Sequence, residues 1–143
     1  MTGTFVNKIY PDQKQTKQMQ EVGPDGSIVM VNLLKFREKA LYKDRRESDL
    51  TGHAAYGLYA QKIPKLIKEY GGRILFAGDT TFLSLGEVTP LWDEVALALY
   101  PTRKALFDMS TSRAWQEIAI HREAGLEGQL NIETSPSYLP KEL

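Results

Sequence analysis

Cysteine is absent from this chain of 143 residues, and histidine occurs only twice. Without cysteine there is no disulfide, no thiolate metal ligand and no thiol catalysis, and a reducing cytoplasm suits such a chain. Net charge is also absent, because 18 basic residues balance 18 acidic ones. A protein without an overall field attracts neither nucleic acid nor an anionic membrane. We therefore expect a cytoplasmic protein with no nucleic-acid partner and no membrane partner.

Long hydrophobic runs and the common catalytic motifs are missing as well. No apolar stretch approaches the roughly 20 residues of a transmembrane helix, and the opening MTGTFVNKIYPDQ lacks the apolar core of a signal peptide. There is no glycine-rich phosphate loop, no HExxH zinc motif and no Gly-x-Ser-x-Gly elbow. The sequence therefore predicts no metal site and no cofactor. What is present is an ordinary globular composition in a length that suits one domain.

Turn signals and hydrophobic patterns divide the first part of the chain into elements. Residues 1–26 form a polar extension that ends in the turn GPDG and can hold a short helix from Pro11 or Asp12. The stretch 27–36 is rich in β-branched residues and predicts a strand. The charged stretch 37–50 predicts a loop with at most one helical turn.

A long helix is expected next, and the second half of the chain repeats the pattern. Thr51 should cap a helix that runs to about Tyr70. Pro64 should kink this helix or end a first segment, and the glycines at 71–72 should stop it. The remaining elements follow in order: a strand over 73–88 that bends near Gly78, a strand over 92–101, helices over 103–112 and 113–125 capped by Thr102 and Ser112, a strand over 126–134, and a tail over 135–143.

The order β-α-β-β-α-β is that of the ferredoxin-like sandwich, an α+β fold, and it places the folded domain at residues 27–134. Helices cover only one face of such a sheet, so its strands should alternate apolar and polar residues. Instead, residues 28–36 and 95–100 of the predicted strands are apolar on both faces. A second copy of the sheet is the simplest cover. The sequence therefore predicts a homodimer joined through the sheet face, with Ala98 in the interface.

Four stretches of the chain, taken in order, resemble domain-of-unknown-function family 1330 over about residues 24–134: VMVNLLKFR, YGLYAQKIPKLIKEYGGRILFAG, WDEVALALYPTRKALFDM and IAIHREAGL. The resemblance implies the dimeric α+β barrel superfamily, in which two ferredoxin-like protomers pack sheet against sheet. Similar proteins of that superfamily include cofactor-free monooxygenases, haem-degrading enzymes, chlorite dismutases, muconolactone isomerases and stress-responsive proteins. The chain departs from the family pattern with YPTR in place of YPS and with Trp115 in place of a tyrosine. Because family 1330 has no established reaction, the resemblance implies fold and assembly rather than chemistry.

Asn32 is the first candidate for a catalytic residue, because it is a polar side chain inside an apolar strand. A buried amide needs hydrogen-bond partners, and similar monooxygenases use an asparagine of their first strand to line a pocket. A hydrogen bond to the backbone of a neighbouring loop is the structural alternative.

His121 is the second catalytic candidate, as a general base or a haem ligand, because histidine is so scarce in the chain. It lies shortly before Gly125, in the last turn of its predicted helix. A cation there complements the helix dipole, and the dipole would raise the pKa of the imidazole. The favourable interaction of cations with the end of the helix is therefore enough to explain why His121 and Arg122 occur there, without any catalytic role.

Three candidate ligand-binding residues flank the second predicted strand pair. Trp92 could wall a cavity or anchor the rim of the barrel, and Tyr100 adjoins the turn that leads to Arg103. Arg103 lies at the positive end of its helix, which is unfavourable for a cation. A carboxylate such as Asp93 or Glu94, or else an anionic ligand, should compensate it, and the structural alternative is a solvated surface arginine.

Three more candidates lie on the first predicted helix and at the start of the next strand. Arg73 could hold a carboxylate of a ligand, or pair with Glu69 or Asp79. His53, in the first turn of its helix, could act as a base, and Tyr56 could contribute a hydroxyl. The alternatives are a solvated histidine and a tyrosine half-buried between helix and sheet.

These patterns leave two hypotheses for function, both built on a small apolar or carboxylate-bearing molecule held between helices and sheet. The first is a monooxygenase- or isomerase-like enzyme without a cofactor, in which Asn32 or His121 works in a dry pocket. The second is a non-enzymatic binding or stress-related dimeric module that uses the same pocket or only its dimer surface. An enzyme needs its polar groups to converge on one cavity, whereas a module can have them scattered and bonded to the backbone.

Overall fold

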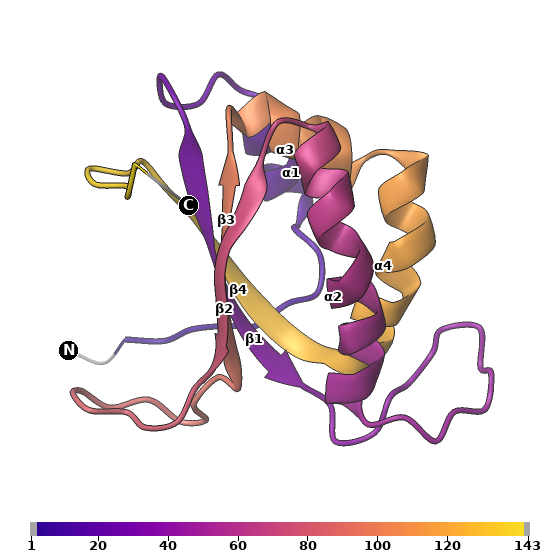
Figure 1. Ribbon diagram of the computed structural model, residues 1–143. Helices are drawn as coiled ribbons and strands as arrows, with labels where there is room; N and C mark the ends of the chain where they lie inside the picture. Colours follow the sequence, from indigo (N-terminus) through magenta and orange to yellow (C-terminus); the bar gives the residue numbers. More distant parts are fainter. Residues whose placement is uncertain (1–2, 142–143) are drawn as a thin grey trace.

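A computed structural model describes residues 3–141 and shows four helices on one face of a four-stranded antiparallel sheet (Figure 1). The strands are β1 (Ile28–Phe36), β2 (Arg73–Asp79), β3 (Glu94–Tyr100) and β4 (Leu126–Thr134), in the spatial order β2-β3-β1-β4. The helices are α1 (Gln13–Met19), α2 (Gly52–Glu69), α3 (Arg103–Ser110) and α4 (Arg113–Gly125). The predicted α+β class is confirmed, and the strand order is that of a ferredoxin-like sandwich.

The predicted division into extension, domain and tail stays a prediction. Its outermost residues, 1–2 and 142–143, lie outside the described residues. Within the extension, α1 forms as predicted, with Asp12 as its cap. No helix among the described residues is both long and apolar enough to cross a membrane.

Side-chain caps start the helices where the sequence places them. The hydroxyl oxygens of Thr51, Thr102 and Ser112 accept hydrogen bonds from the backbone N–H three residues further on, at 3.0, 3.0 and 3.2 Å. Asp12 and Gln15 cap α1 reciprocally, each side chain accepting a hydrogen bond from the other's backbone N–H. These bonds satisfy amide groups that a helix start would otherwise leave unpaired.

The end of α2 explains why two glycines follow it. Gly71 has a φ of 85°, in the left-handed region that favours glycine. The N–H of Gly71 donates to the Lys68 carbonyl and that of Gly72 to the Ile67 carbonyl, both at 3.0 Å, which is a Schellman motif. The helix runs through Pro64 as a single element, so the predicted end of a first segment does not occur.

Strand β2 is shorter than the strand predicted over 73–88. It ends at Asp79, where the backbone N–H of Thr80 donates to the Asp93 carbonyl at 2.9 Å and the chain leaves the sheet. The stretch beyond alternates like a strand but has no partner strand, and Leu85 within it is 89% exposed. A stretch with a strand-like pattern forms a loop when no neighbouring strand is present to accept and donate its backbone hydrogen bonds.

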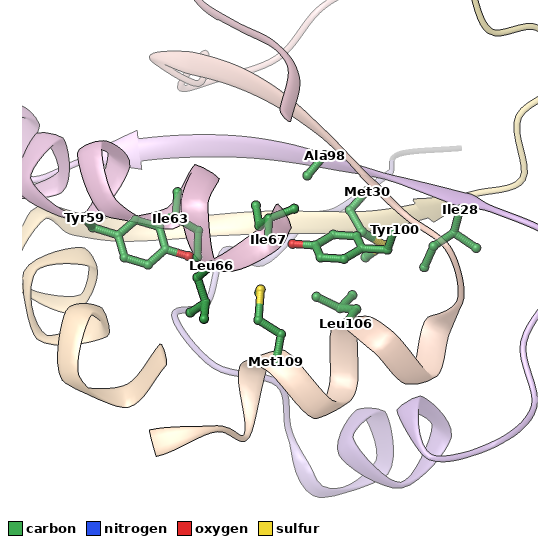
Figure 2. Close-up of a cluster of buried hydrophobic side chains, with 10 residues drawn as sticks. All are labelled: Ile28, Met30, Tyr59, Ile63, Leu66, Ile67, Ala98, Tyr100, Leu106 and Met109. Atoms are coloured by element: carbon green, nitrogen blue, oxygen red, sulfur yellow. The ribbon is translucent and has the colours of Figure 1, made fainter. Parts of the chain in front are cut away.

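The hydrophobic core lies between the sheet and helices α2 and α3 (Figure 2). Met30 and Ala98 pair directly across β1 and β3 and face the helices. The placement of Ala98 in a sheet-face interface is therefore wrong, because its side chain belongs to the buried helix-facing row and is only 4% exposed. The core residues are Ile28, Met30, Tyr59, Ile63, Leu66, Ile67, Ala98, Tyr100, Leu106 and Met109.

The opposite sheet face is apolar, and none of the described helices covers it (Figure 1). By register it carries Val29, Val31, Leu33, Val95, Leu97, Leu99, Leu130 and Ile132. Phe76 and Ile132 are 52% and 47% exposed. Residues 134–140 flank this face and form a groove with it. The prediction that the strands are apolar on both faces is thus realised in the structure.

Candidate functional site

His121 lies against the loop that precedes α2, away from the sheet. Its Nδ1 is 2.6 Å from the Tyr42 hydroxyl, and the two rings meet edge to face at 5.5 Å. Burial lowers the pKa of His121, and the positive charges of Arg46 and Lys62 lower it further. The pKa rise expected from the helix end is therefore wrong, because burial and two nearby cations outweigh the dipole.

Asn32 lies on the helix-facing side of β1, and its amide is bonded to strand backbone. Its Nδ2 donates to the Ala96 carbonyl at 3.2 Å and to the Met30 carbonyl at 3.4 Å. This resembles the structural alternative, although the partner is strand rather than loop. Asn32 and His121 share no partner, so the structure does not bring the two catalytic candidates together.

Arg103 is compensated by a carboxylate, although not by either of the two suggested by the sequence. Its Nε and Nη2 donate to the two carboxylate oxygens of Glu133, both at 2.7 Å. Glu133 lies on β4 and faces the helix layer, a proximity that only the strand order creates. The hydrogen bonds from Arg103 lower the pKa of Glu133. This bidentate pair occupies the guanidinium, so Arg103 is not presented to a ligand.

Trp92 holds the N-terminal segment (residues 5–10) against the sheet. Its indole Nε1 donates to Asn7 Oδ1 at 2.9 Å, and its ring lies 4.9 Å from that of Phe5. Lys8 then pairs with Gln129 on β4 through two backbone hydrogen bonds, of 3.0 and 2.8 Å. The segment thereby passes from the open sheet face to the helix side (Figure 1).

Tyr100 and Arg73 take up ordinary positions in the sheet. Tyr100 is a core residue, 4% exposed, and burial raises the pKa of its hydroxyl. Arg73 is exposed at the start of β2, opposite Leu99. Tyr100 belongs to the same core as Tyr59, whose negative charge when ionised would raise the pKa of Tyr100 further.

The first cluster is aromatic and lies between α2 and α4. The rings of Tyr56 and Tyr59 are 5.4 Å apart, and the Trp115 indole N–H donates to the Tyr59 hydroxyl at 3.1 Å. Burial raises the pKa of both tyrosines, while the nearby positive charge of Arg122 acts in the opposite direction. The phenols are therefore protonated and available as hydrogen-bond donors at neutral pH.

Arg122 is the charged centre of this aromatic cluster. It is only 7% exposed, and its guanidinium lies 5.5 Å from the Tyr10 ring and 5.7 Å from the Trp115 ring. Nη2 donates to the Ile9 carbonyl at 2.7 Å, but Nη1 is buried without a hydrogen-bond partner. Among residues 3–141, no carboxylate forms an ion pair with it. A buried, unpaired positive charge is costly and is uncommon without a reason.

The second cluster combines His53 with two carboxylates at the end of the sheet. Asp79 and Glu94 pair directly across β2 and β3, and His53 Nε2 is 4.0 Å from Glu94 Oε1. The potential ligand atoms of these three residues lie within 4.8 Å of one another. His53 and Asp79 line an open polar pocket of about 780 Å³, which does not include Arg122.

The family described as "Domain of unknown function (DUF1330)" matches residues 46–134, more than half of the chain. The chain belongs to this family. A solved structure of a protein of unknown function from Rhodopseudomonas palustris is similar, with a TM-score of 0.82 and 27% identity over 94% of this chain and 100% of that one. A methylated form of that protein gives a TM-score of 0.82 and 28% identity, covering 97% of this chain and 100% of its own. Comparison with curated proteins found no match.

Within this DUF1330 chain, sequence reasoning missed the importance of three residues. Arg122 was explained by the helix end, although it follows Trp115 by two helical turns and so lies in the buried stripe of α4. A charged residue at a position of the helix that should be buried could have been recognised in the sequence as a candidate site residue. Asp79 and Glu94 appeared only as partners for arginines, and their pairing depends on a strand register that the sequence does not reveal.

Proposed function

We propose that this chain is a cytoplasmic, homodimeric small-molecule-binding module that holds a carboxylate-bearing molecule between its helices and its sheet. The observation that carries this proposal is the buried Arg122 guanidinium, whose Nη1 has no partner. A ligand carboxylate would supply the missing negative charge and the missing acceptor together. The cytoplasmic location rests on the absence of cysteine.

The surroundings of Arg122 favour a carboxylate attached to an apolar or aromatic body. Tyr56, Tyr59 and Trp115 provide ring surfaces, and the two phenols can donate hydrogen bonds. A small, strongly hydrated anion such as phosphate would gain little from these walls. An apolar acid gains burial of its body and pairing of its charge.

Detachment of the N-terminal segment (residues 5–10) would open this site to a ligand. The Ile9 carbonyl accepts a hydrogen bond from Arg122 Nη2, and the Tyr10 ring lies over the Arg122 guanidinium. A carboxylate that displaced the Ile9 carbonyl could accept from both terminal nitrogens at once, and a bidentate charged pair is stronger than one neutral acceptor. Tyr10 is itself held by a hydrogen bond of 2.6 Å to Glu123, so ligand binding and detachment of this segment are expected to be coupled.

A monooxygenase- or isomerase-like enzyme is the weaker of the two hypotheses. Its polar groups should converge on one cavity. Instead, the Asn32 amide is bonded to the Ala96 and Met30 carbonyls, and His121 is bonded to Tyr42. The arrangement supports a binding module over the enzyme.

The homodimer is proposed on the open sheet face. The apolar rows of β1, β3 and β4 on that face lack a described helix to cover them. A second copy packed sheet against sheet would remove these residues from water and complete the barrel implied by the family resemblance. The helix-side site around Arg122 would remain within each protomer.

Binding of benzoate tests the proposal, with benzamide as its neutral counterpart. The chain has two tryptophans, and only Trp115 lies beside Arg122, whereas Trp92 bonds Asn7. Benzoate should shift the Trp115 indole N–H signal in a saturable NMR titration and leave the Trp92 signal in place, and benzamide should bind at least about tenfold more weakly.

Two substitutions on α4 sharpen this test. Arg122→Gln should weaken benzoate binding by at least about tenfold. Arg113→Gln, at an arginine whose side chain is 92% exposed, should leave it unchanged. Equal binding of benzoate and benzamide, benzoate affinity that survives Arg122→Gln, or a Trp115 signal unmoved by both benzoate and hexanoate would overturn the proposal.

A further inference from the structure

We propose that His53, Asp79 and Glu94 form a binding site for a divalent transition-metal ion at the end of the sheet. Three elements bring these ligands together, since His53 lies in the first turn of α2, Asp79 ends β2 and Glu94 begins β3. Their potential ligand atoms lie within 4.8 Å of one another. The site shares no residue with the Arg122 cluster, so it does not depend on the carboxylate-binding function.

The two carboxylates are placed where a cation is most needed. Asp79 and Glu94 are direct cross-strand partners, and like charges opposite each other destabilise a sheet. Among the described residues, no lysine or arginine forms an ion pair with either one. The nearby Lys35 is paired with Asp93 at 3.1 Å. A bound dication would neutralise the repulsion that the register imposes.

The environment of Glu94 agrees with a site short of positive charge. The Glu94 side chain is only 16% exposed and lies directly across the strand pair from Asp79, and among the described residues only His53 comes within ion-pair distance of it. A neighbouring metal ion would stabilise the ionised carboxylate far more than an exposed imidazole does.

His53 is positioned to complete the set rather than simply to lie in solvent. Its ring packs edge-on against Phe36, with centroids 5.0 Å apart, while Nε2 is directed to within 4.0 Å of Glu94 Oε1. Metal–ligand distances of about 2.0–2.2 Å place neighbouring ligands about 3–3.5 Å apart. Metal binding would require the ligands to move closer together, and the His53 side chain, which is 65% exposed, has room to rotate toward Glu94.

The donor set and the open pocket indicate which ion would bind and how. One imidazole nitrogen and two carboxylate oxygens suit Zn²⁺, Mn²⁺ or Fe²⁺ better than the all-oxygen preference of Ca²⁺ or Mg²⁺. His53 and Asp79 line the polar pocket of about 780 Å³. With three protein ligands, the remaining coordination positions would face that pocket and be open to water or a small molecule.

Metal titration of the chelator-treated full chain tests the proposal. Zn²⁺ should bind at one site per chain by calorimetry. Mn²⁺, which is paramagnetic, should broaden the imidazole NMR signals of His53 and spare those of His121, the chain's only other histidine. His53→Ala and Asp79→Asn should each weaken Zn²⁺ binding by at least about tenfold.

Two matched variants serve as controls. His121→Ala removes the other histidine, and Glu127→Gln removes a carboxylate that lines the same pocket outside the proposed ligand set. Both should leave the Zn²⁺ affinity within about twofold. Circular dichroism checks that every variant is folded, which is expected for the exposed His53 and Asp79. Equal broadening of both histidines, affinity that survives His53→Ala and Asp79→Asn, or no binding of either ion would overturn the site.

Discussion

The imidazole of His121 shows how a local rule can be outweighed by its surroundings. The last turn of a helix favours a cation, but this side chain is packed against Tyr42 and lies near Arg46 and Lys62. In the tautomer with its proton on Nε2, Nδ1 accepts a hydrogen bond from the Tyr42 hydroxyl, whose oxygen lies 2.6 Å away. Protonation of Nδ1 would reverse that bond, since the Tyr42 oxygen can also accept. The folded state favours the neutral imidazole because of burial and the positive charges of Arg46 and Lys62.

A pH dependence of stability follows from the lowered pKa of His121. The unfolded chain binds the proton more readily, so the stability is complete above the unfolded pKa of about 6.5 and is lost as pH falls through the folded pKa. His121→Gln should remove this loss between pH 7 and pH 5. Urea unfolding of both proteins across this range measures it, with His53→Gln as the control that should keep the loss.

An NMR titration of the imidazole gives the same answer independently. The His121 signals should titrate below pH 6.5. If they titrate above it, and stability increases toward acid, the helix end controls this residue after all.

Single residues were predictable where chemistry is local and unpredictable where it depends on register. Thr51, Thr102 and Ser112 cap helices as expected, because capping involves only neighbours three residues away. The predicted partner of Arg103 was wrong, because the actual partner, Glu133, is brought close only by the strand order. The proposed metal ligands were not predicted for the same reason, since Asp79 lies beside Glu94 only through the pairing of β2 with β3.

At the scale of elements, α2 and α4 come into close backbone contact at Gly52 and Gly125. A Cβ added at Gly125 would overlap the Gly52 carbonyl oxygen and lie 2.7 Å from the Tyr56 backbone nitrogen. Only glycine therefore allows this separation of the helices. The contact also fixes where Tyr56 and Arg122, on the two facing helices, lie relative to each other.

Gly125→Ala should lower the free energy of unfolding by about 1–3 kcal/mol, because the two helices must separate to admit a methyl group. Gly57→Ala is the matched control, since a Cβ at that position in α2 meets nothing within 4 Å. The control should be neutral or stabilising by up to about 1 kcal/mol through helix propensity. Urea denaturation compares the two, and equal effects would show that the glycine contact is not tight.

Element boundaries were predictable to the extent that each had its own signal. Caps and glycines marked the helices, and both-face apolar runs marked β1 and β3. The end of β2 was missed because residues 80–88 carry a strand-like pattern, and only the absence of a partner strand makes them a loop. The helix through Pro64 was misjudged because packing of Ile63, Leu66 and Ile67 into the core holds the helix on both sides of the proline.

At the scale of the whole molecule, the proposed dimer makes a direct prediction for the open sheet face. Leu97 pairs with Val31 in the register and lines the groove on that face. Leu97→Glu would bury an unpaired carboxylate in the interface, at a cost of several kcal/mol. Sedimentation should show a dimer for the unaltered chain at micromolar concentration, and a monomer or insoluble protein for the variant.

Ala60→Glu is the control for this substitution, because Ala60 is exposed on α2, on the far side of the sheet. It should sediment as the unaltered chain does. A soluble, stable monomer of the unaltered chain would exclude the interface, and a Leu97→Glu dimer would place it elsewhere.

The pairing of Lys8 with Gln129 has a consequence for the behaviour of the protein at high concentration. Strand β4 is one of the two outer strands of the sheet, and an outer strand with free amide and carbonyl groups can recruit strands from other chains into aggregates. Lys8 occupies both the N–H and the C=O of Gln129, so a foreign strand cannot use these two groups. The same residues that lead the chain to Arg122 therefore also block strand pairing at this point of the β4 edge, and a ligand that detached them would leave the Gln129 groups open to a foreign strand.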